Sequence, residues 1–239
     1  TLGRSTAEMH MKIAGSERTE FRPEPFSKLY QRSLYQSFQS QVRRVGKLID
    51  SLSAKDFTED LYRDIKKIRS LQERTFQELR RIAGDKLPAY KIRVHNDYHL
   101  GQVLWTGREA VIIDFEGRTD VPFSERRLKR PAIGDAADMM RSFHYASYHA
   151  LELSASSSPV AMAWADLWYH CASGLFLSAY IDKMAAAGWL SKESDQREAI
   201  LIPLLLQRMY QAMEYHLQKG EHDHLLVSMH GIFDLLGAG

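Results

Sequence analysis

The sequence has one cysteine and lacks any long apolar run. Cys171 stands alone among 239 residues, which excludes an intrachain disulfide framework and a cysteine-based metal site. A lone cysteine fits a reducing compartment, so we expect a cytoplasmic protein. No apolar stretch approaches the ~18 residues of a membrane-spanning helix, and no signal peptide is visible. We therefore expect no membrane partner.

The composition also lacks an excess of either charge. The 32 basic and 30 acidic residues give a formal net charge of +2, which gives no reason to expect a nucleic-acid partner. The hydrophobic content of 44% and aromatic content of 10% are those of a globular protein. A chain of this length can bury a substantial core in one domain or two subdomains.

The part of the chain before Leu87 lacks a strand pattern and a glycine-rich loop. Its apolar residues recur every three or four positions, which predicts amphipathic helices. We expect helices over residues 1–14, 26–52 and 57–83, the last two forming an antiparallel helical hairpin. Arg22–Pro25 is typical of a turn.

The part after Gly134 is also expected to be helical. The apolar pattern predicts helices over residues 135–153, 160–187 and 192–217, and a short closing helix after a polar break at 220–224. Asp135 has the features of a helix N-cap, with Asp138 at the third helical position. His222 and His224 around Asp223 are more typical of an exposed polar turn than of a metal site.

The stretch from Arg93 to Gly117 contains the residues from which a site can be built. Its two short apolar runs, Val103–Trp105 and Val111–Ile113, flank a polar Thr-Gly-Arg-Glu connection, which predicts a β-hairpin. Asp97 and Gln102 precede the first strand, and Asp114 closes the second. The hairpin would bring these three side chains together. Carboxylate and amide oxygens suit Mg²⁺ and, through it, a phosphate chain.

The spacing of these residues follows a kinase pattern. Protein kinases carry H-x-D-x-x-x-x-N, with a catalytic Asp and a metal-binding Asn, followed by a D-F-G whose Asp holds Mg²⁺. This chain has His95-x-Asp97, then Gln102 five residues after the Asp, then Asp114-Phe-Glu. The loop resembles that of the aminoglycoside-phosphotransferase-like small-molecule kinases.

A longer string narrows the resemblance. It reads H-x-D-Y-H-L-G-Q-V-L, I-I-D-F-E-G, S-E-R-R-x-K-R and D-A-A-x-M-x-R-S-F-x-Y-A. This string looks like the maltokinases, including the form fused to the C-terminal end of trehalose synthase. The close match covers about Ile92 to Ala150, and a weaker one beginning L-G-R-x-T-A-E-x-H extends it back to Leu2.

This resemblance implies a mainly α, α+β kinase-like fold. We expect one C-terminal lobe over residues 1–239, with a helical subdomain (1–86), a catalytic loop, hairpin and activation-like segment (87–134), and a second helical subdomain (135–239). The ATP-binding N-terminal lobe of such kinases is absent from this sequence, which starts at Thr1 without a methionine. We therefore expect a fragment that by itself binds ATP poorly and turns over little.

The resemblance also implies a reaction, in which maltose and ATP give maltose 1-phosphate and ADP. Asp97 would accept the proton of the sugar hydroxyl, while Gln102 and Asp114 would bind Mg²⁺. ATP is then the co-substrate. The missing N-terminal lobe and a fused trehalose synthase domain would be partners.

Further residues are supporting or substrate-binding candidates. They are His95, His99, Glu116, Arg126, Arg127, Lys129, Asp135, Arg141, Tyr210 and Glu214. We favour a structural, hydrogen-bonding role for His95, and expect Asp135 to brace the catalytic loop as well as cap its helix. His99 would contact substrate or complete the hydrogen bonding of the loop. Asn96 stands where maltokinases usually have glycine.

Three alternatives stay open. The chain could be a non-catalytic, pseudokinase-like module that docks on a trehalose synthase or binds sugar. It could act in a kinase for another sugar, such as glucosamine. In the third, His95, Asp97, His99 and Asp114 would be transition-metal ligands of a hydrolase, although the Asp-to-Gln spacing favours a kinase.

Overall fold

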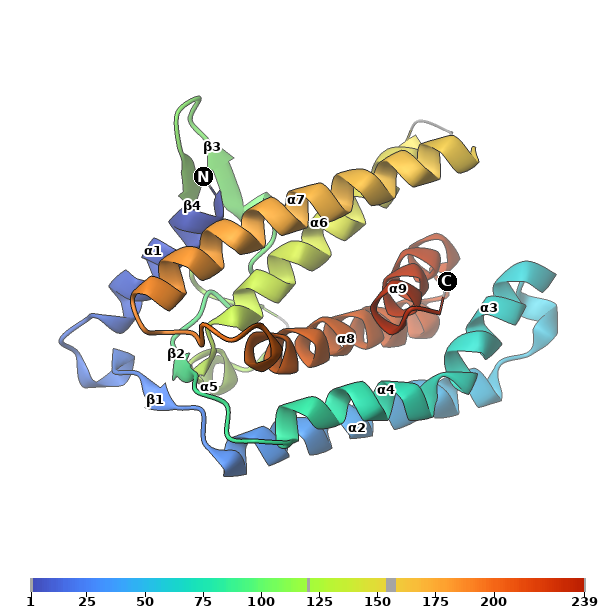
Figure 1. Ribbon diagram of the computed structural model, residues 1–239. Coiled ribbons are helices and arrows are strands. Elements are labelled where there is room, and N and C mark those ends of the chain that lie inside the picture. The colour runs from blue at the N-terminus through green and yellow to red at the C-terminus, as the bar shows by residue number, and fades with distance from the viewer. Residues whose placement is uncertain (1, 120, 154–157, 239) are drawn as a thin grey trace. The chain divides into compact units, whose positions relative to one another are not determined.

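The computed structural model describes residues 2–119, 121–153 and 158–238, apart from the side chains of Glu152, His222 and Asp223. Within these ranges the chain is mostly helical, with strands of two or three residues (Figure 1). Contacts divide it into two compact units. Unit 1 contains Thr1–Phe26 and Leu87–Arg197, and unit 2 contains Ser27–Lys86 and Glu198–Gly239. Each unit is therefore assembled from two separate stretches of sequence.

Unit 1 is built on three long helices, of which α7 packs along the other two (Figure 1). These helices are α1 (Leu2–Ala14), α6 (Ile133–Leu153) and α7 (Pro159–Ala186). Shorter helical pieces are η1 (Thr19–Phe21), η4 (Leu100–Gln102) and α5 (Phe123–Arg126). The helices that the apolar spacing predicts over 1–14 and 160–187 are confirmed as α1 and α7.

Two small antiparallel sheets complete unit 1. The predicted hairpin is confirmed as β3 (Val103–Trp105) and β4 (Ala110–Ile112), with Val103 opposite Ile112. The second sheet has the order β1 (Glu24–Pro25), β2 (Tyr90–Ile92), β5 (Arg130–Pro131). Reading Arg22–Pro25 only as a turn is therefore wrong, because Glu24 and Pro25 pair with β2. Strands of two residues are too short to show the alternation by which a strand is recognised.

The regular secondary structure of unit 2 is all helical among its described residues. It contains α2 (Lys28–Ser51), η2 (Ala54–Asp56), α3 (Glu59–Ser70), α4 (Gln72–Arg80), η3 (Arg81–Ala83), α9 (His222–Leu236) and most of α8 (Ser194–Lys219). The side chain of Ser27 caps α2 and that of Thr58 caps α3. α2 contacts both α3 and α4, as the expected helical hairpin requires.

One long helix over residues 57–83 was expected, and this prediction is wrong. The helix is interrupted at Leu71, where ψ is 1° and α4 starts again at the next residue. The Thr75 hydroxyl donates a hydrogen bond to the Leu71 carbonyl at 3.1 Å, a contact that often bends helices. The apolar spacing gives no sign of the break, because α3 and α4 both continue to bury one face.

Close approach of α1 and α7 depends on Gly3. A Cβ atom at this position would overlap the carbonyl oxygen of Phe176 and lie 3.1 Å from the amide nitrogen of Tyr180. Both atoms belong to the backbone of α7, which cannot give way as a flexible side chain can. Glycine is therefore the residue that allows this helix contact.

We predict that Gly3→Ala lowers the free energy of unfolding by about 1–3 kcal/mol, the usual effect of overpacking. Urea unfolding followed by circular dichroism measures it. Arg4→Ala, one residue along on the exposed side of α1, should change stability by no more than about 0.5 kcal/mol. Equal stability of Gly3→Ala and the unmodified chain would contradict the proposed contact.

Candidate active site

The hairpin brings the two predicted metal ligands together. Gln102 ends η4 immediately before β3, and Asp114 follows β4 by two residues. The amide of Ile113 donates to the carbonyl oxygen of Gln102 at 3.0 Å, which extends the strand pairing to the base of the hairpin. The side-chain Nε2 of Gln102 donates to Oδ2 of Asp114 at 3.1 Å. The amide and the carboxylate are thus neighbours at an exposed position.

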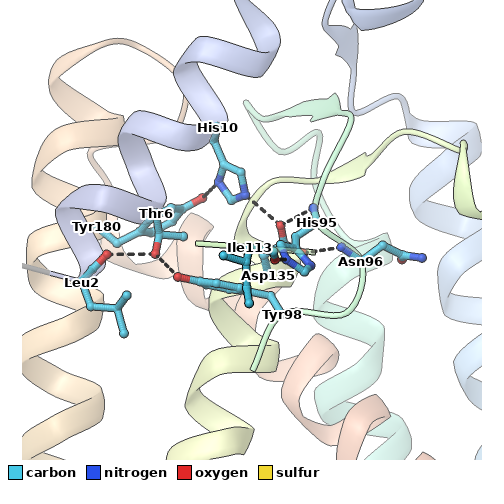
Figure 2. A network of polar contacts seen from close by, with 9 residues as sticks. All are labelled: Leu2, Thr6, His10, His95, Asn96, Tyr98, Ile113, Asp135 and Tyr180. Carbon is cyan, nitrogen blue, oxygen red and sulfur yellow. Dashed lines mark hydrogen bonds and ion pairs between the residues drawn. The ribbon is translucent and has the colours of Figure 1, made fainter. Parts of the chain in front are cut away.

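His95 joins the predicted catalytic loop to the end of the hairpin. Its ring is 1% exposed and lies against the rings of Tyr98 and Phe115. Nε2 is 2.8 Å from the carbonyl oxygen of Ile113 (Figure 2). Because a carbonyl can only accept, Nε2 carries the proton and donates. This bond holds the loop that leads to Asp97 beside the residue that precedes Asp114.

The carboxylate of Asp97 is available to bind a ligand. The residue is partly buried, and its side chain makes no hydrogen bond or ion pair within the part of the chain that the structure describes. The neighbouring Tyr98 is anchored instead, because its hydroxyl lies 2.7 Å from Oγ1 of Thr6 on α1. The carboxylate of Asp97 can therefore accept a proton from a bound molecule.

Two residues of this region have left-handed backbone conformations. Asn96 has φ of 63° and Asp114 has φ of 62°, and these are the positive values among the described non-glycine residues. Such conformations are uncommon outside glycine, although Asn and Asp tolerate them best. Asn96 thus adopts the conformation that glycine would adopt at less strain. Asn96 directly precedes the catalytic candidate Asp97, and Asp114 is itself a metal-binding candidate; strained residues of this kind are common at functional sites.

Asp135 holds the loop in this conformation. Its Oδ2 accepts a hydrogen bond from the amide of His95 at 2.7 Å, and its Oδ1 accepts one from the amide of Asn96 at 3.1 Å. The expectation that Asp135 is an N-cap is wrong, because α6 already begins at Ile133. Aspartate is favoured throughout the first helical turn. The predicted start of the helix was therefore too late by a few residues.

His10 completes the surroundings of Asp135, and the sequence analysis missed it. Its Nε2 lies 2.9 Å from Oδ2 of Asp135, and its Nδ1 lies 3.0 Å from the hydroxyl of Tyr180 on α7 (Figure 2). Both His10 and Thr6 are fully buried. Two polar residues four positions apart on the buried face of a helix are a signal that could have found this network.

Burial and hydrogen bonding act in opposite directions on the pKa of Asp135. Burial by itself raises the pKa of this carboxyl, but the hydrogen bond and charge of His10 and the two backbone amides outweigh it. The pKa therefore lies below its ordinary value and the group is a carboxylate. Burial raises the pKa of Tyr98 and Tyr180 well above the usual range. Both hydroxyls therefore keep their protons.

Two of the candidate cations are used within their own segment. Nε and Nη2 of Arg126 donate to the carbonyl oxygens of Val121 and Thr119 at 2.7 and 3.0 Å. The guanidinium of Arg127 lies 5.5 Å from the centroid of the Phe123 ring. These contacts give Arg126 a structural use, whereas Arg127 stays exposed.

Lys129 ties the activation-like segment to β1. Its Nζ lies 2.9 Å from Oε1 of Glu24, while Nζ of Lys91 lies 2.9 Å from Oε2 of the same carboxylate. The hydrogen bonds from Lys129 and Lys91 lower the pKa of Glu24 to about 2. Lys129 therefore stabilises the β1–β2–β5 sheet in this structure, through its ion pair with Glu24.

The remaining loop candidates have different surroundings. His99 caps η4, because its Nδ1 accepts a hydrogen bond from the amide of Gly101 at 3.1 Å. Glu116 is exposed next to the hairpin, and Arg141 is partly buried on α6. Of these three, His99 has the better-defined structural role.

Tyr210 and Glu214 belong to unit 2 and have partners there. The hydroxyl of Tyr210 lies 2.9 Å from Oγ1 of Thr75 in the interior, and burial raises the pKa of Tyr210 to about 12. Glu214 accepts hydrogen bonds from Arg44 at 2.8 and 3.3 Å. Both side chains therefore stabilise the packing of unit 2.

The donor set fits Mg²⁺ better than a transition metal. Asp114 and Gln102 offer hard oxygen atoms, which Mg²⁺ prefers. The described residues contain no group of three or more His, Cys, Asp or Glu side chains that could hold a metal ion. The expected polar turn at His222, Asp223 and His224 is wrong, because α9 begins at His222; the side chains of His222 and Asp223 lie outside the described residues. None of the helices in the described ranges is long and apolar enough to cross a membrane.

Comparisons with known proteins lead to glucosamine kinases. No protein-family profile matches the chain. A glucosamine kinase of Streptacidiphilus jiangxiensis is 28% identical over 110 residues, which cover 46% of this chain and 24% of that protein. A glucosamine kinase of Mycolicibacterium smegmatis is 33% identical over 94 residues, covering 39% of this chain and 23% of that protein.

Solved structures extend the likeness to the whole chain. A glucosamine kinase crystal structure superposes with a TM-score of 0.79 and 19% identity, covering 99% of this chain and 51% of that one. A second, in complex with glucosamine, ADP and inorganic phosphate, gives the same TM-score and is covered to 53%. The chain thus spans about half the length of these kinases. The expected mainly α, kinase-like fold is confirmed.

We predict that Asp135→Asn lowers the free energy of unfolding by about 3 kcal/mol at pH 7, because it leaves a buried network without its charge. The folded-state pKa of Asp135 is lowered. Its stabilising contribution is therefore present above the unfolded-state pKa of about 4 and is lost as pH falls through the folded value. Urea unfolding between pH 7 and pH 3 should show the two proteins converging at low pH. The exposed variant Asp85→Asn serves as control, and a difference that grows on acidification would contradict the prediction.

Proposed function

We propose that this chain is the C-terminal catalytic lobe of an ATP-dependent sugar kinase. The observation that carries the proposal is the pairing of Gln102 with Asp114 next to the loop of Asp97. A free carboxylate on a loop that is bonded to the segment carrying two oxygen ligands is what in-line phosphoryl transfer needs from this half of a kinase. The likeness to glucosamine kinases across 99% of the chain supports the same conclusion.

In the proposed reaction, Asp97 orients the acceptor hydroxyl of the sugar. The hydroxyl oxygen attacks the γ-phosphorus of ATP, the bond from that phosphorus to the β,γ-bridging oxygen breaks, and ADP leaves. Asp97 accepts the hydroxyl proton. Asp114 and Gln102 would hold Mg²⁺, which supplies neutralisation of the phosphate charge. The hydrogen bond that Asp135 accepts from the His95 amide, and the one that the His95 ring donates to the Ile113 carbonyl, keep the backbone of this loop in place.

The nucleotide requires residues beyond this lobe. Kinases cover the ATP phosphates with a glycine-rich loop and bind them with a strand lysine. The sequence contains neither feature before Leu87, and the solved glucosamine kinases are about twice as long. We therefore propose that the polypeptide carrying this lobe needs an ATP-binding half for turnover.

The substrate is best sought among amino sugars. The resemblance to maltokinases implied maltose, but the relatives and solved structures reported above are glucosamine kinases. We therefore propose glucosamine as the first candidate and maltose as the second. A trehalose synthase partner is supported by the resemblance to maltokinases alone. The free carboxylate of Asp97 argues against a non-catalytic sugar-binding module.

We predict that the polypeptide carrying this lobe together with an ATP-binding half forms ADP when it receives Mg²⁺, ATP and glucosamine. A coupled assay with glucosamine, maltose and glucose ranks the sugars by kcat/KM. Chelation of Mg²⁺ should abolish turnover, and the 239-residue chain alone should show little. Saturable sugar binding with no turnover of any sugar would support the non-catalytic module instead.

We predict that Asp97→Asn lowers kcat about 100- to 10,000-fold, the usual contribution of a general base, while KM for the sugar changes little. Steady-state kinetics measure both constants. Asp85→Asn, a matched exposed carboxylate, should keep normal kinetics. Equal thermal unfolding curves for the two variants exclude misfolding, and an unchanged kcat in Asp97→Asn would refute the assignment.

A further inference from the structure

The turn that carries Gln102 is bonded to helix α6. The amide of Leu100, the first residue of η4, donates a hydrogen bond to Oγ of Ser142 at 3.0 Å. Ser142 lies in the middle of α6 and is partly buried. A serine inside a helix often bonds to a carbonyl of its own helix, as Ser147 does with the carbonyl of His144 at 2.8 Å. Ser142 instead accepts a hydrogen bond from the loop.

This bond places η4, because the other amides of the turn have acceptors inside the loop. The amide of Gly101 donates to Nδ1 of His99 at 3.1 Å, and the amide of Gln102 donates to the carbonyl oxygen of His99 at 2.9 Å. Both bonds begin and end within the loop, so they shape the turn without positioning it. Of the three amide bonds of η4, the one from Leu100 to Ser142 is the one that reaches another element.

Ser142 lies on the same side of α6 as Asp135. The two residues are seven positions apart, so their side chains project within about 20° of each other and about 10 Å apart along the helix axis. Asp135 accepts hydrogen bonds from the amides of residues 95–96, and Ser142 accepts one from the amide of Leu100. One side of α6 therefore holds the loop at both ends, and Asp97 lies in the stretch between them.

The two contacts of α6 act on different parts of the candidate site. The amides bonded to Asp135 directly precede Asp97 in the chain. The amide bonded to Ser142 lies two residues before Gln102. Without the Ser142 contact, the turn that ends at Gln102 would lose its bond to α6, while the backbone before Asp97 would keep its own.

We propose that Ser142 is a positioning residue for Mg²⁺ binding, because it fixes η4 and, through η4, the position of Gln102 next to Asp114. The proposal rests on the proposed function, in which Gln102 and Asp114 bind Mg²⁺. This ion demands near-ideal octahedral geometry, so a small displacement of one ligand weakens its binding. In this scheme Ser142 touches no reacting atom and acts through Gln102.

Amide hydrogen exchange, measured by NMR on the 239-residue chain, tests the contact itself. Ser142→Ala should speed exchange of the Leu100 amide about threefold or more, because it removes the acceptor. Ser142→Thr keeps a hydroxyl and should restore the slow exchange. Ser147→Ala is the matched control, because it removes a hydroxyl of the same helix that is bonded within that helix. Equal exchange at Leu100 in Ser142→Ala and the unmodified chain overturns the proposal.

Calorimetry on the polypeptide that carries this lobe together with an ATP-binding half tests the consequence for the metal. Ser142→Ala should weaken binding of the Mg²⁺ complex of ADP about three- to tenfold, the ratio that one neutral hydrogen bond supports. Binding of ADP in the presence of EDTA should stay unchanged, and Ser142→Thr should bind both forms normally. Equal affinity of Ser142→Ala and the unmodified polypeptide for the Mg²⁺ complex overturns the proposal. An equal loss for ADP with EDTA overturns it too.

These measurements separate the role of Ser142 from the proposed function. A polypeptide that binds the Mg²⁺ complex of ADP more tightly than ADP alone, and loses this difference in Ser142→Ala, supports the role of Ser142 even if it phosphorylates no sugar. In that case the proposed function alone fails. An unmodified polypeptide that binds the Mg²⁺ complex no better than ADP with EDTA overturns both.

Discussion

The arrangement of the candidate site depends on one buried charge. The carboxylate of Asp135 is removed from water, so its free energy is acceptable only if several donors surround it. Those donors come from His10 on α1 and from the backbone amides of His95 and Asn96. Hydrogen bonds to the two carboxylate oxygens of Asp135 therefore join α6, α1 and the loop at residues 95–96, which are far apart in sequence. It also fixes the backbone of the loop in which Asp97 lies.

A second consequence is a division of labour between buried and exposed groups. His95, Asp135 and His10 have their hydrogen bonds inside the protein, where water cannot compete. Asp97, Gln102 and Asp114 stand at its surface, where they can meet a ligand. For the proposed reaction, rigid support beneath accessible oxygens would favour catalysis by positioning, because the site would need little reorganisation to reach the transition state. The left-handed Asn96 and Asp114 mark where this support overrides local backbone preference.

The sequence predicted the parts of this structure whose signals are local. Apolar spacing located α1, α2 and α7, and the two short apolar runs located the hairpin that pairs Gln102 with Asp114. It could not reveal the β1–β2–β5 sheet, since strands of two residues carry no periodicity. Nor could it reveal the break at Leu71, where the Thr75 hydroxyl bonds to the Leu71 carbonyl within an unbroken apolar pattern. His10 was missed because its partners lie more than a hundred residues away. Tertiary contacts of that kind leave no trace in neighbouring residues.

The assembly of each unit from two separate stretches also bears on how the protein is made. Unit 1 is complete only when residue 197 has been synthesised, and the second stretch of unit 2 begins only after that, at Glu198. Helices α2, α3 and α4 therefore leave the ribosome long before the second stretch of their own unit exists, and the apolar surface that this stretch later covers is then exposed. Nascent chains in this state are open to aggregation. A chaperone that binds exposed apolar helices during translation would lower this risk of aggregation until the second stretch of unit 2 has been made.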